Sequence, residues 1–263
     1  MSTDADLARY ETILTSLLRA AVARPTATDR ATAYAHCVLG LEVPSISDGN
    51  EGVRSDRAIH ELLTHYASHR IGQPIINAPL APKALPPTLA SNSATWIAVA
   101  WGALSNVAQP LRDVGDRPVH PADHRSEAML GATTAVGTFE HLIAHQQPAG
   151  HFLAPSANDN LESWWYAELI LLHAVGTYAV ETNDPHAFQA AGRAADYHLN
   201  ETQPDHATSE PWAVFPFLLL PETRSLADQV LHNANMMAPD GTTLLLLADA
   251  LYCLRKFISR GTA

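Results

Sequence analysis

Cysteine is scarce in this chain of 263 residues, which contains only Cys37 and Cys253. Two cysteines cannot build a disulfide framework, and both lie in apolar helical patterns, so we expect buried, reduced thiols. Basic charge is sparse too, with 16 Lys and Arg against 27 Asp and Glu and a formal net charge of −11. Because an acidic surface repels phosphate groups, this balance argues against a nucleic-acid partner or an anionic membrane surface.

The sequence also lacks a segment that could enter a bilayer. Its longest apolar runs, such as FPFLLL and TLLLLADALYCL, are too short or too polar to cross one. The N-terminal stretch MSTDADLARYETILTSLL carries acidic residues where a signal peptide needs basic ones, and it has no unbroken apolar core. We therefore expect no membrane insertion and a cytoplasmic protein.

Strand-like alternation is missing, whereas helical periodicity runs along almost the whole chain. Leu14 and Leu18 share one stripe of segment 4–23, and segment 160–181 is apolar nearly all round. With 47% hydrophobic and 16% charged residues, the composition is that of a globular protein. We predict a single all-α domain over residues 1–263. Its predicted helices cover residues 4–23, 28–40, 53–72, 92–108, 122–146, 160–181, 184–201, 210–220, 222–237 and 242–259.

Prolines and capping residues mark the ends of these helices. Asp184 stands before Pro185, which predicts an N-cap followed by a proline in the first turn. The arrangement is repeated where Ser209 precedes Glu210 and a proline. Segment 74–87, PIINAPLAPKALPP, is too rich in proline to be a helix and predicts a long extended loop of the kind that often carries function.

Three junctions resemble one another and indicate repeated helical hairpins. Segments 141–152, 197–208 and 232–243 each close one helix, pass a proline and open the next helix. Weaker junctions at prolines 25 and 74 bring the expected number to about five hairpins and about ten helices. Repetition of one hairpin per unit is typical of stacked helical repeats, and an irregular helical bundle is the alternative.

Part of this pattern resembles known families, mainly over residues 139–259. The stretch IAHQQPAGHF (143–152), with Gln147, Gly150 and Phe152, resembles the glutamine–tryptophan-type repeat of the terpenoid cyclase and protein prenyltransferase toroid, and LNETQPDH (199–206) is a degenerate copy. HAVGTYAVETNDPHAFQAAGRAADYHL resembles a hairpin of the six-hairpin glycosidase toroids. These resemblances imply an (α/α) toroid, complete or incomplete, of inner and outer helices.

The chemistry of those families is not supported by the residues. The Asp-x-Asp-Asp acid of the hopene-type cyclases is absent, and neither cysteine has the setting of a prenyltransferase zinc ligand. Histidine pairs four residues apart, such as His141 and His145, could share a helix face, but none forms His-Glu-x-x-His. We therefore predict no metal and no cofactor, and we expect His173 to be a core histidine.

In a toroid the N-termini of the inner helices gather around one hollow, where their partial positive charges converge. Exposed tryptophan faces beside carboxylates are a way to hold and cleave sugars, with one acid protonating the leaving group and another carboxylate activating water. The predicted catalytic residues are Glu168, His206, Glu210 and Asp240. The predicted ligand-binding residues are Glu162, Trp164, Trp165, Asp205 and Trp212.

Each of these residues also has a structural interpretation. Trp164 and Trp165 could fill the core, Glu210 could favour a helix N-terminus, and Asp240 with Gly241 is a turn signal. Two functions follow. The favoured one is a non-catalytic binding or scaffold protein, with a homodimer covering its open edge as one form. The alternative is a carbohydrate-active enzyme acting on a small neutral ligand such as a sugar; terpenoid-related or metal-dependent chemistry is a weaker third.

Overall fold

The fold was analysed in a computed structural model, which describes residues 3–23, 30–41, 139–140, 142–153, 161–201, 210–234 and 241–261. The predicted helices 53–72 and 92–108, most of helix 122–146 and the proline-rich segment 74–87 lie outside these residues. The described elements are all helical, which confirms the all-α class for this part of the chain. None of the described helices is long and apolar enough to cross a membrane.

Four long helices carry most of the described structure. They are α1 (Thr3–Val22), α6 (Leu161–Thr182), α7 (Pro185–Glu201) and α10 (Gly241–Gly261), and the shorter α2 (Arg30–Leu39) follows α1. Other short elements connect α7 to α10: the 3-10 turns η5 (Pro211–Ala213) and η6 (Pro221–Thr223), and the helices α8 (Val214–Leu218) and α9 (Arg224–Ala234).

Helix α6 forms the centre of the core. Every residue from 167 to 180 is buried, because α7, α8 and α10 all pack against this helix. A helix enclosed in this way is hydrophobic on all faces, as the sequence of segment 160–181 predicted. Helix α7 instead buries one face of small residues, including Ala187, Ala191 and Ala194, and exposes the other.

The turn between α6 and α7 is set by two neighbouring side chains. Asn183 takes the left-handed conformation (φ 57°) that ends α6, and asparagine tolerates this region better than most residues. Asp184 Oδ1 then accepts a hydrogen bond of 2.8 Å from the backbone N–H of His186. This bond confirms the predicted N-cap and places Pro185 in the first turn of α7.

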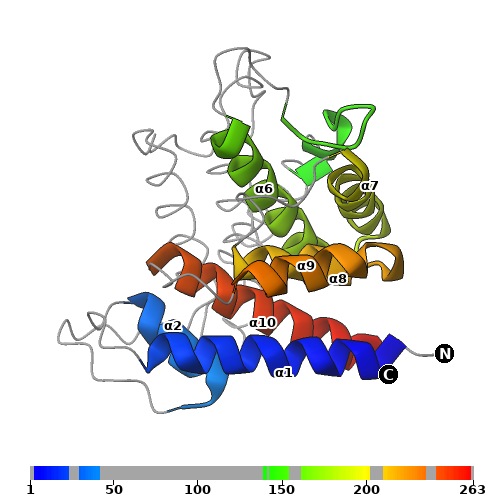
Figure 1. The fold of residues 1–263 in the computed structure, drawn as a ribbon. Coiled ribbons are helices and arrows are strands. Elements are labelled where there is room, and N and C mark those ends of the chain that lie inside the picture. The colour runs from blue at the N-terminus through cyan, green and yellow to red at the C-terminus, as the bar shows by residue number, and fades with distance from the viewer. Residues whose placement is uncertain are drawn as a thin grey trace, which may run out of the picture.

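Helices α1 and α2 pack on the opposite side of α10 from α6 and α7 (Figure 1). Figure 1 shows α1 and α10 running side by side in opposite directions. The buried stripe of α1 includes Leu14 and Leu18, as predicted. Arg255 of α10 joins the helices, since its Nε lies 2.9 Å from Glu11 Oε1 and its guanidinium also donates to the carbonyl oxygen of Val38 at the end of α2.

The single helix predicted for residues 210–220 was wrong in detail. Pro211 opens a 3-10 turn, Pro216 lies inside the short helix α8, and Leu220 is extended (φ −120°, ψ 135°) before Pro221. Proline drives the preceding residue out of the helical region, which fits the extended Glu210 and Leu220, whereas Phe215 before Pro216 stays helical. The helical stretch therefore begins at Pro211 and ends at Leu218, and Pro221 begins a new turn.

We expect Asp184→Ala to lower the free energy of unfolding by about 1 kcal/mol, because it removes the N-cap bond of α7. Urea denaturation followed by circular dichroism measures the loss. Gln189→Ala, on the exposed face of the same helix, is the matched control and should change stability by less than about 0.5 kcal/mol. Equal effects of the two substitutions would contradict the capping role.

Candidate functional site

A loop segment lies across the α6–α7 hairpin, and we call residues 145–153 the strap. Its backbone folds on itself, since the N–H of Gln147 donates to the carbonyl of His151 at 2.8 Å. Gln146 ties the strap to α7: its Nε2 donates to the carbonyl of Ala190 at 2.9 Å, and its Oε1 accepts from Arg193 Nε at 3.0 Å. The glutamine singled out in the sequence, Gln147, bonds only locally, to the carbonyl of His145.

Glu168 of α6 holds the other end of the strap. Its side chain is completely buried. Oε1 accepts a hydrogen bond from the backbone N–H of Phe152, and Oε2 accepts one of 2.9 Å from the N–H of Leu153. Burial raises the pKa of Glu168 to about 8, although the two N–H donors lower it in part. The residue predicted to be catalytic is therefore an internal anchor for a loop.

Gly150 lets the strap approach α7 closely. Its φ of +113° is a conformation that L side chains rarely adopt. A Cβ at this position would lie 2.4 Å from the carbonyl oxygen of Arg193, which belongs to the backbone of α7 and cannot turn aside. The glycine of the predicted repeat is thus required by the geometry.

Aromatic rings and histidines fill the space between the strap and the hairpin. The His151 ring contacts Tyr197 of α7 (centroids 4.7 Å apart) and Trp164 of α6 (5.7 Å), and its Nδ1 donates to the carbonyl of Leu153 at 2.8 Å. His198 is buried behind Tyr197. Burial and the neighbouring His151 lower the pKa of His198 to about 3, so its imidazole is neutral near pH 7.

A second polar group, the Glu210 cluster, consists of Glu210, Trp212 and Thr243. Glu210 Oε2 accepts hydrogen bonds from Trp212 Nε1 at 3.2 Å and from Thr243 Oγ1 at 2.9 Å, in the first turn of α10. All three residues are buried. Trp212 also meets the Tyr166 ring of α6 edge to face at 5.7 Å. The starts of η5 and α10 and the N-terminal half of α6 therefore come together here.

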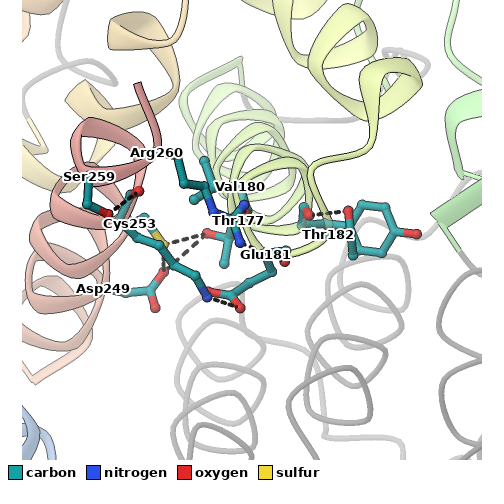
Figure 2. A network of polar contacts seen from close by, with 10 residues as sticks. Thr177, Val180, Glu181, Thr182, Asp249, Cys253, Ser259 and Arg260 are labelled. Carbon is teal, nitrogen blue, oxygen red and sulfur yellow. Dashed lines mark hydrogen bonds and ion pairs between the residues drawn. The ribbon is translucent and has the colours of Figure 1, made fainter. Parts of the chain in front are cut away.

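A third group, the Asp249 cluster, joins α6 to α10 inside the core. Asp249 Oδ2 lies 2.9 Å from His173 Nε2 and accepts a hydrogen bond of 3.2 Å from Thr177 Oγ1. Figure 2 shows Thr177 and Cys253 converging on Asp249 from the two helices, with Cys253 Sγ 3.8 Å from the same oxygen. Burial raises the pKa of the Cys253 thiol well above its usual value. The expectation of a buried, reduced Cys253 is confirmed.

The other predicted site residues are placed as follows. Trp212 is completely buried and Trp164 nearly so, whereas Trp165 is only half-buried. Glu162 belongs to the first turn of α6. Asp205, His206 and Asp240 lie outside the described residues, so the predicted convergence of His206 and Asp240 with the two glutamates stays a prediction. Glu168 and Glu210 bond to different parts of the molecule, the strap and the start of α10.

Sequence analysis missed Asp249, Gln146 and Tyr197. Asp249 had a usable signal, because it is the only charged residue in the apolar run LLLLADALYCL, and a lone buried acid needs partners. Gln146 and Tyr197 had none, since their contacts depend on how the strap crosses α7. Within the described ranges, no three His, Cys, Asp or Glu side chains are arranged to hold a metal ion.

Comparisons with protein-family models, with curated proteins and with solved structures found no match. The chemistry of the site must therefore be argued from the contacts above.

We expect Gly150→Ala to cost at least about 2 kcal/mol of unfolding free energy, because the new methyl group meets backbone while φ is strained. Gly40→Ala is the control: its φ is +68°, but nothing lies within 4 Å of the added carbon. That variant should lose only about 1 kcal/mol. Urea titration of both variants measures the difference. Similar losses of unfolding free energy would show that the close approach of Gly150 to Arg193 does not exclude a larger side chain.

We expect Asp249→Ala to lower the free energy of unfolding by about 3–5 kcal/mol, because His173 and Thr177 lose their shared acceptor in a buried setting. Thr177→Val, which removes one donor and keeps the shape, should cost about 1 kcal/mol. Guanidinium denaturation measures both. A loss below about 1 kcal/mol for Asp249→Ala would mean that the cluster contributes little to folding.

Proposed function

We propose that this chain is a non-catalytic binding protein, built from helical hairpins in a complete or incomplete (α/α) toroid, that holds a neutral ligand such as a sugar. One observation carries the proposal. Both described carboxylates that the sequence nominates for catalysis, Glu168 and Glu210, are buried and accept hydrogen bonds from within the protein.

Glycoside cleavage needs carboxyl groups that reach the substrate. One must protonate the leaving oxygen, and the other must attack or activate water from about 5–10 Å away. Glu168 has both oxygens bonded to the strap, and Glu210 has one oxygen shared by Trp212 and Thr243. Turning either group toward a ligand would leave buried N–H or O–H donors without an acceptor, at a cost of about 1–3 kcal/mol each. Both residues are therefore better suited to holding parts of the fold together than to catalysis.

Trp165 is the described residue best placed to contact a ligand. It lies in the N-terminal part of α6, and of the tryptophans at 164, 165 and 212 it alone is half-buried. A tryptophan face offers a large apolar surface at low entropic cost, which suits the C–H face of a sugar ring. The neutral ligand also agrees with the acidic net charge of −11, which would repel anions.

The enzyme alternative keeps one specific observation in its favour. His173 Nε2 lies 2.9 Å from Asp249 Oδ2, the arrangement in which a carboxylate orients an imidazole for general base catalysis. The two side chains are 0% and 2% exposed, so a substrate would need an opening between α6 and α10 to reach them.

The binding proposal predicts that at least one sugar from a panel of neutral mono- and disaccharides raises the melting temperature of the wild-type protein. Trp165→Ala should abolish that shift, because the stacking face is lost. Leu41→Ala, which removes an exposed apolar side chain at the end of α2, is the matched control and should keep it. Differential scanning fluorimetry and calorimetric titration measure both.

Two outcomes would overturn the proposal. If no member of the panel shifts the melting temperature, a neutral sugar is excluded as the ligand. Release of reducing sugar by the wild type that disappears in a folded His173→Gln variant would establish the enzyme alternative instead.

A further inference from the structure

We draw no further inference here: the strongest candidate, the buried indole N–H of Trp164 at the N-terminal end of α6, which has no hydrogen-bond acceptor among the described residues, is enclosed by the protein, and nothing in the described part of the chain shows an opening through which a ligand could reach it.

Discussion

The burial of residues 167–180 of α6 on all sides is the constraint on which the described structure depends. A helix with no solvent-facing side must satisfy each polar side chain it carries with partners inside the protein. Glu168 does so through the strap, and His173 and Thr177 do so through Asp249 of α10. The polar residues of this one helix therefore determine where the strap and α10 pack.

The three polar groups differ in what they join. Glu168 fixes a loop to a helix, the Glu210 cluster fixes a 3-10 turn to the start of α10, and the Asp249 cluster fixes two helices to each other. In each case a carboxyl oxygen accepts hydrogen bonds from another segment: the strap for Glu168, η5 and α10 for Glu210, and α6 for Asp249. Hydrophobic packing has no directional preference, whereas these bonds select one relative position of the elements. This role explains why acids occur in an otherwise apolar interior.

Much of the local structure could be predicted from the sequence, because local rules govern it. The stripe of α1, the enclosed character of α6 and the cap at Asp184 follow from periodicity and from residue preferences over a few positions. The end of segment 210–220 was not predicted in detail, because Pro221 makes Leu220 extended and helical periodicity does not register that effect. The functions of Glu168 and Asp249 depend on partners 15 and 76 residues away, and no pattern in one sequence gives such pairings. Of the predicted rim, Trp165 keeps partial exposure, whereas Trp164 and Trp212 lie in the core.

The position of Cys253 has a practical consequence. Alkylating reagents attack the thiolate, and this thiol is both enclosed and held protonated by its surroundings. It becomes reactive when the helices packed around α10 separate and water reaches the sulfur. The rate at which Cys253 is modified in the native protein therefore measures how often the core around α10 opens.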